Sequence, residues 1–142
     1  MKFFIGTDHA GFALKASVLV CLQTLGHETI DLGPHSTDRV DYPDYAKIVC
    51  QAVLENEGSF GILICGTGIG MSMSANKFKG IRAGLCTDAY TASMTRAHND
   101  ANVLCMGERV VGPGVAESIV RAFCTTDFEG GRHACRVGKI EL

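Results

Sequence analysis

The stretch spanning residues 59–77, S-F-G-I-L-I-C-G-T-G-I-G-M-S-M-S-A-N-K, constrains the fold of this chain more than any other segment. It begins with a short apolar run at 60–64, rich in branched residues and typical of a buried strand. Cys65 ends this run, and residues 71–77 are compatible with a helix start. Three glycines lie between them at alternate positions: Gly66, Gly68 and Gly70. Such a strand, turn and helix N-terminus form a pocket of backbone N–H groups that suits an anion, either a phosphate or the oxyanion of a polarised carbonyl.

Short apolar runs alternate with helix-like segments along the rest of the chain. Strands are expected at 2–6, 29–32, 60–65, 81–86 and 102–106. Helices are expected at 11–25, 44–55, 71–77, 88–96 and 114–123, and the basic tail at 129–142 is less regular. Five strands alternating with helices predict an α/β fold: a single doubly wound, Rossmann-like domain over residues 1–142, with a five-stranded parallel sheet covered on both faces.

Composition and charge exclude several classes of protein. The net charge of the 142-residue chain is only −2 and charged residues make up 20% of it, so no basic surface for nucleic acid is indicated. The apolar runs are far shorter than the roughly 20 residues of a membrane span, and the N-terminus meets polar residues too early for a signal peptide. The seven cysteines form no C-x-x-C pair, which favours free thiols in a reducing cytoplasm over disulfides or a zinc site.

Cys65 is the candidate reactive group of the glycine turn. Open α/β sheets bind ligands at the C-terminal ends of their strands, and Cys65 stands at that position. An ordinary thiol has a pKa of about 8.5 and a helix N-terminus lowers it, so a thiolate base near pH 7 is reasonable. The turn is not a P-loop, because no Gly-Lys-Ser/Thr follows, and Met71 occupies the third small position of the dinucleotide fingerprint. A small anionic metabolite therefore fits this turn better than a nucleotide.

Asp8 and His9 follow the first expected strand, which places them at the same sheet edge as Cys65. Asp8 has an ordinary structural interpretation as a helix cap. His9 is not a usual cap acceptor, and this favours the alternative that both side chains hydrogen-bond a polar ligand.

His98 and Asn99 lie between the fourth expected helix and the fifth expected strand. With Asp100 they could form a plain turn, since Asn and Asp tolerate turn conformations. A residue that precedes its strand lies at the opposite edge of the sheet from Cys65. A site shared by Cys65 and His98 therefore requires that the helix end swings over the edge or that a second subunit supplies His98.

Two arginines four residues apart, Arg132 and Arg136, stand beside Lys139 in the tail. On a helix this spacing puts both guanidinium groups on one face, where they can grip one phosphate. The ordinary alternative is a solvated basic tail. Arg109, just after the fifth strand, is a further cation that could join the cluster.

Five segments together resemble the type B ribose-5-phosphate isomerases, in order and over nearly the whole chain. They are G-T-D-H-A-G-F, D-Y-P-D-Y-A, G-I-L-I-C-G-T-G-I-G-M-S-M-S-A-N-K, R-A-H-N-D-A-N-V-L and F-E-G-G-R-H-A-C-R-V. The wider family also contains galactose-6-phosphate isomerase subunits and allose-6-phosphate isomerases. The sequence leaves open whether a pentose or a hexose phosphate is preferred.

The resemblance implies interconversion of ribose 5-phosphate and ribulose 5-phosphate through an enediolate, without a metal or other cofactor. Cys65 matches the family's proton acceptor, and the region 71–74 lacks the glutamate that some members use instead. His98 matches the proton donor that opens the furanose ring, with Thr67 close by. The remaining matches are backbone amides for the enediolate oxygen (Gly66, Gly68, Ile69, Gly70), sugar contacts (Asp8, His9, Asn99) and the phosphate region (Arg109, Arg132, Arg136). The resemblance also implies a homodimer, often paired into a tetramer, with sites shared between subunits.

Two alternatives come from other functional classes. A non-catalytic phosphosugar-binding protein would share the glycine turn and the arginines but would not need a thiol at Cys65. A redox or thiol-transfer enzyme would use an activated cysteine, but no resolving cysteine stands nearby in the sequence. The combination of segments favours the isomerase.

Overall fold

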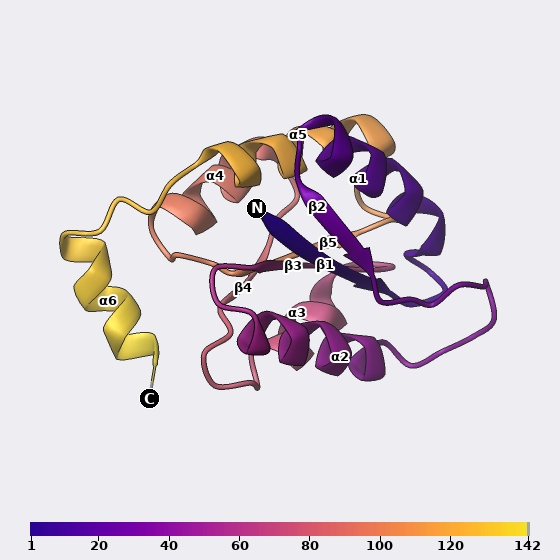
Figure 1. Cartoon of the computed structure of the whole chain (residues 1–142), viewed down its shortest axis with the longest axis horizontal. Helices are drawn as coiled ribbons and strands as arrows, with labels where there is room; N and C mark the ends of the chain where they lie inside the picture. The colour runs from indigo at the N-terminus through magenta and orange to yellow at the C-terminus, as the bar shows by residue number, and fades with distance from the viewer. Residues whose placement is uncertain (142) are drawn as a thin grey trace.

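A five-stranded parallel sheet lies between two layers of helices, in the strand order β2-β1-β3-β5-β4 (Figure 1). The computed structural model describes residues 1–141. The strands are β1 (Lys2–Thr7), β2 (Glu28–Asp31), β3 (Phe60–Cys65), β4 (Ala83–Leu85) and β5 (Val103–Gly107). The helices are α1 (Phe12–Thr24), α2 (Tyr42–Glu55), α3 (Ile69–Ala75), α4 (Ala89–Ala97), α5 (Pro113–Thr125) and α6 (Arg132–Ile140). The predicted α/β fold with a five-stranded parallel sheet covered on both faces is confirmed.

Two apolar cores form because side chains alternate between the faces of each strand. On β3, Ile62 and Ile64 pack with α1, α4 and α5, whereas Leu63 and Cys65 pack with α2 and α3. This central strand is buried on both faces, which explains why its sequence is an unbroken apolar run.

The carboxyl ends of β1, β3 and β5 meet at one edge of the sheet. Thr7 pairs with Ile64, and Cys65 pairs with Gly107. The turn between β1 and α1 is pressed onto this edge at Gly11, where a Cβ atom would lie only 2.4 Å from the carbonyl oxygen of Ile64. Only glycine permits such a close backbone approach, so the β1–α1 turn is held directly against the end of β3.

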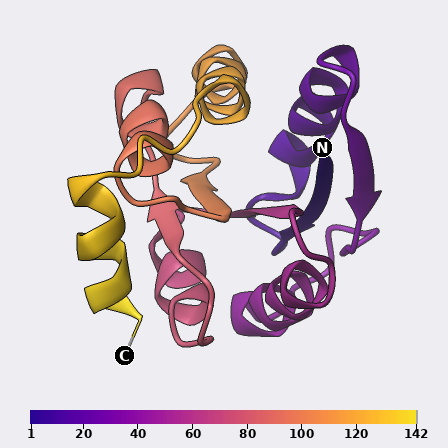
Figure 2. The same ribbon diagram turned by 60° about the vertical axis from the view of Figure 1, so that its left-hand side comes forward.

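The C-terminal tail is more regular than its sequence indicates. We expected an irregular tail, but Arg132–Ile140 forms helix α6, and Leu142 lies outside the described residues. Helix α6 lies at the β4 edge of the sheet, outside the two helix layers (Figures 1 and 2). Its only buried residue is His133, and its apolar residues Val137 and Ile140 are half-buried and exposed, so the helix does not face a core.

The other expected elements differ from the structure mainly at their ends. Helix α3 begins at Ile69, two residues earlier than expected, because the helix starts directly after the left-handed Gly68. Helix α2 also begins earlier, at Tyr42, and β4 is shorter than the expected strand at 81–86. Within residues 1–141, none of the helices has both the length and the apolar character that crossing a membrane requires.

Candidate active site

The glycine turn after β3 directs a backbone donor at the Cys65 sulfur. Gly68 adopts a left-handed conformation with φ 79°, and its N–H donates to Cys65 Sγ over 3.1 Å. The next amide, at Ile69, donates to the Thr67 hydroxyl oxygen over 3.2 Å. The Gly68 contact fixes the position of the sulfur at the end of the strand, directly beside the glycine turn. The side chain is 96% buried within its core, at the edge where the strands end.

The loop after β5 is joined to the glycine turn by two backbone hydrogen bonds. Glu108 N–H donates to the Cys65 carbonyl and Arg109 N–H donates to the Gly66 carbonyl, at 2.9 and 3.0 Å. The Arg109 side chain lies against Gly66, with Nη1 3.5 Å from the position that a Cβ atom would occupy. The Glu108 carboxylate in turn accepts from Leu14 N–H over 2.7 Å, which ties this loop to the first turn of α1. Arg109 is thus placed beside the glycine turn; within one chain it does not join Arg132 and Arg136, although the sequence suggested that it could.

We expect Gly68→Ala to lower both stability and activity. Alanine at this left-handed φ costs about 1–2 kcal/mol, and its Cβ would lie 2.8 Å from the Met106 carbonyl carbon, which adds to that cost. Gly66→Ala is the matched control for stability, because its Cβ would meet neighbouring atoms only at 3.5 Å or beyond. Urea denaturation of both variants measures the difference. Equal stability of the two variants would contradict the conformational argument.

Asp8 and His9 lie at the same edge, as predicted, but both are partly committed to structural contacts. Asp8 Oδ1 accepts from the N–H groups of Ala10 and Gly11, at 2.9 and 3.0 Å, which fixes the turn before α1; Asp8 is not the helix cap, because the N-cap is Gly11 and no side chain caps this helix. His9 Nδ1 accepts from Val40 N–H over 3.3 Å, which fixes the ring against the segment that precedes α2.

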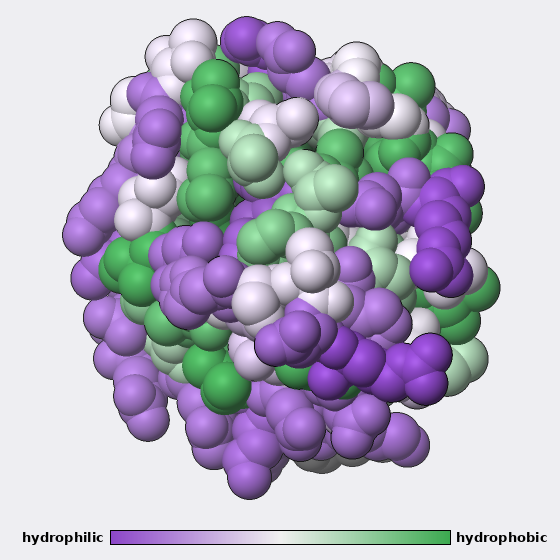
Figure 3. All heavy atoms as spheres, turned by 90° about the vertical axis from the view of Figure 1, so that its right-hand side faces the viewer, coloured by the Kyte–Doolittle hydropathy of each residue, from purple (hydrophilic) through white to green (hydrophobic). Residues whose placement is uncertain are grey.

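A pocket of about 520 Å³ opens beside these residues and includes two side chains that sequence reasoning did not identify. They are Arg39 and Tyr42, and the pocket is also lined by Asp8 and His9. The Tyr42 ring lies over the glycine turn, because a Cβ at Gly70 would be 2.6 Å from Tyr42 Cζ. Figure 3 faces this edge of the molecule, where pale, weakly polar residues near the centre lie among strongly hydrophilic ones. The segment D-Y-P-D-Y-A carries the signal that could have identified Tyr42.

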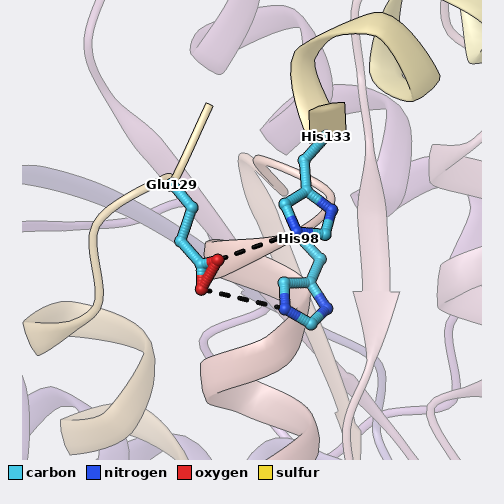
Figure 4. Close-up of side chains that lie close together, drawn as sticks. All are labelled: His98, Glu129 and His133. Atoms are coloured by element: carbon cyan, nitrogen blue, oxygen red, sulfur yellow. Dashed lines mark ion pairs between the residues drawn. The ribbon is translucent and has the colours of Figure 1, made fainter. Parts of the chain in front are cut away.

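The remaining predicted residues gather at the opposite edge of the sheet. His98 ends α4, and its ring stacks on His133 of α6 with 4.2 Å between centroids and 8° between planes. The Glu129 carboxylate lies 3.9 Å from His98 Nε2 and 3.7 Å from His133 Nε2 (Figure 4). Asn99 follows His98, and the exposed Arg132 and Arg136 lie on α6.

His98, Glu129 and His133 are also the residues that come nearest to a metal-binding set, with their ligand atoms within 4.8 Å of one another. Their geometry does not fit an ion as it stands. Two nearly parallel rings cannot both point a nitrogen lone pair at one ion, since the ion must lie close to the plane of each imidazole.

Cys65 and His98 are not brought together within one chain, as the topology predicts. Gly61 N–H donates to the carbonyl of Asn102, so the beginnings of β3 and β5 lie side by side, and His98 precedes this point. Cys65 lies four residues further along β3, which is about 13 Å at the usual rise of a strand. One chain therefore holds two half-sites: Cys65, Thr67, Asp8, His9 and Arg109 at one edge, and His98, Asn99, Arg132 and Arg136 at the other.

Proteins that match this chain over nearly its whole length are named as sugar-phosphate isomerases. The family model described as Ribose/Galactose Isomerase matches residues 3–140. Ribose-5-phosphate isomerase B of Escherichia coli (strain K12) is 50% identical over 139 residues, covering 98% of this chain and 93% of that protein. The solved structure of Clostridium thermocellum ribose-5-phosphate isomerase B superposes with a TM-score of 0.96 at 52% identity, covering 99% of this chain and 95% of the other. The type B ribose 5-phosphate isomerase of Trypanosoma brucei gives a TM-score of 0.95 at 50% identity, covering 99% and 96%. The chain therefore belongs to the ribose/galactose isomerase family.

Proposed function

We propose that this chain is an aldose–ketose isomerase that interconverts ribose 5-phosphate and ribulose 5-phosphate. The observation that carries the proposal is the Cys65 sulfur at the end of β3, with the Gly68 N–H directed at it over 3.1 Å. An aldose–ketose exchange needs one base that moves a proton between adjacent carbons, and it needs donors for the oxyanion that develops. The names of the relatives in Escherichia coli, Clostridium thermocellum and Trypanosoma brucei support ribose 5-phosphate as the substrate.

In the proposed reaction the Cys65 thiolate removes the proton from C2 of the open-chain aldose and returns it to C1. The enediolate oxygen is held by backbone amides of the turn at Gly66, Gly68, Ile69 and Gly70. Two of these amides already have acceptors inside the turn, the Cys65 sulfur and the Thr67 hydroxyl, so the substrate oxygen would share donors that are already oriented. The proposed reaction uses no metal, and the free thiols of the chain favour a reducing compartment such as the cytoplasm.

The complete site is proposed to form between two copies of the chain. In this arrangement His98 and Asn99 of one subunit face Cys65, Thr67, Asp8 and His9 of the other, and His98 opens the furanose ring as proton donor. The phosphate is held by Arg109 together with Arg132 and Arg136 of the second subunit. The separation of the two half-sites within one chain supports this shared site, since neither half holds both a base and a ring-opening group. Subunits in a homodimer, or in a tetramer of paired dimers, would supply both halves.

The test is a metal-free incubation of the wild-type protein with ribose 5-phosphate in heavy water, with ketose formation and deuterium uptake followed together by NMR. We expect ribulose 5-phosphate that carries solvent deuterium. Binding without turnover would shift the proposal to allose 6-phosphate or galactose 6-phosphate, which the same assay can test. If these sugars also fail, the isomerase proposal is wrong and the chain is a phosphosugar-binding protein.

A further inference from the structure

The Glu129 carboxylate lies at the side of two stacked imidazoles (Figure 4). It lies in the segment between α5 and α6, and its backbone N–H donates to the Ala97 carbonyl at the end of α4 over 3.0 Å. This contact holds Glu129 beside His98, because His98 directly follows Ala97 in the chain. Its two carboxylate oxygens then face different rings, Oε1 toward His98 Nε2 and Oε2 toward His133 Nε2 (Figure 4).

The two imidazoles are not equivalent. The His133 side chain is 9% exposed and its Nε2 atom is buried without a hydrogen-bond partner, whereas the His98 side chain is 39% exposed. Burial lowers the pKa of His133, and the neighbouring His98, Arg132 and Arg136 lower it further, against an opposing effect of Glu129. His133 is therefore the neutral, enclosed member of the pair, and His98 is the member that can reach a substrate.

Among the charged groups near His98, the carboxylate of Glu129 is the acidic group that can pair with it, because Asp100 is already paired with arginines. On its own segment, Arg96 is paired with Asp100 at 2.9 Å, and Asp100 also pairs with Arg82 at 3.3 Å. Helix α6 brings the cations Arg132 and Arg136 near the histidine pair. Within residues 1–141, the carboxylate at ion-pair distance from His98 is that of Glu129. A carboxylate at this distance attracts the Nε2 side of the imidazole and so restricts the orientation of the ring.

We propose that Glu129 is a positioning residue for ring opening: its carboxylate holds the His98 imidazole in one orientation, with the enclosed His133 ring stacked behind it. The inference rests on the proposed function. In the assisted step, protonated His98 gives its proton to the ring oxygen as the bond from C1 to that oxygen breaks. The C1 hydroxyl proton leaves to water as the C1 carbonyl forms, and His98 regains a proton from water.

The test compares two reactions of the same enzyme. Conversion of ribose 5-phosphate begins from a ring and needs ring opening. Ribulose 5-phosphate is open-chain, because its C5 oxygen carries the phosphate, so exchange of its C1 proton with heavy water needs only the base at Cys65. Loss of a residue that assists ring opening slows only the conversion of ribose 5-phosphate. General damage to the site also slows the C1 exchange of ribulose 5-phosphate.

For Glu129→Gln we expect kcat on ribose 5-phosphate to fall by about 10-fold or more, with KM and C1 exchange changed by less than about twofold. Glu129→Asp keeps the charge and is expected to recover part of the lost kcat. The matched control is Glu117→Gln, which removes a carboxylate of similar exposure, 52% against 54%, from the exposed pair with Arg121. This control is expected to leave both reactions at the wild-type rate.

Equal losses of both reactions in Glu129→Gln, or no loss of either, would overturn the inference. A variant that unfolds is recognised by its melting temperature, and Glu129→Asp then decides: conversion reduced with exchange intact supports the positioning role, and any other result contradicts it. If the wild type exchanges C1 protons but does not convert ribose 5-phosphate, the ring-opening role fails. If it does neither, the proposed function fails, and the inference with it.

Discussion

Cys65→Ala is expected to abolish exchange of the substrate C2 proton with solvent while leaving sugar-phosphate binding intact. The thiol is the only group proposed to carry this proton, and removing a positioned base typically costs about 10²- to 10⁴-fold in rate. The proposed phosphate contacts, by contrast, come from arginines that the substitution does not touch. NMR in heavy water measures the exchange, and calorimetric titration with ribose 5-phosphate measures binding.

Cys50→Ala is the matched control for this variant. Cys50 belongs to the same apolar core as Cys65, and burial raises the pKa of its thiol to about 12, so it stays protonated near pH 7. We expect this control to lose about 1 kcal/mol of stability from the small cavity and to keep its proton exchange. Exchange that persists in Cys65→Ala would refute the role of Cys65 as the base.

Mixing two inactive variants, Cys65→Ala and His98→Asn, is expected to restore activity. Each variant alone has a defect in every site, but a hybrid dimer contains one site with both native residues. Random reassociation makes half of the dimers hybrids, with one intact site in two, so about a quarter of the wild-type activity should return. The mixture is made by co-refolding the two chains, and conversion of ribose 5-phosphate is the readout.

The control mixture contains Cys65→Ala and the double variant Cys65→Ala with His98→Asn. No intact site can form in this mixture, so it should remain inactive although hybrid dimers form equally well. Affinity tags on one chain of each mixture report whether hybrids are present. Hybrids of the first mixture that remain inactive would show that Cys65 and His98 do not share a site across subunits.

The fold could be predicted from the sequence wherever burial controls the residue pattern. Strand β3 was predicted at its observed bounds, because a strand buried on both faces is a continuous apolar run that ends where the glycine turn begins. Helix α6 could not be predicted in this way, because it buries only His133 and contributes no residue to either apolar core. The early start of α3 depends on the left-handed Gly68, a local backbone detail that the sequence pattern does not reveal.

The sequence predicted those parts of the candidate site that depend only on the order of strands and helices. The positions of Cys65 and His98 relative to their strands place them at opposite sheet edges, and the structure confirms this separation. Tyr42 and Arg39 were missed, because their place in the pocket depends on the path of the loop before α2. Glu129 was missed for a similar reason: a single acid in a connecting segment has no sequence signal, and its role depends on the backbone contact with Ala97.

The position of α6 outside the helix layers separates folding from the role proposed for its arginines. Neither apolar core draws a residue from this helix, and its buried side chain, His133, packs against His98 rather than against the sheet. Most substitutions on the exposed face that carries Arg132 and Arg136 therefore cost little folding free energy. If these arginines hold the phosphate as proposed, evolution can change that contact in small steps without first acquiring compensating mutations in the core.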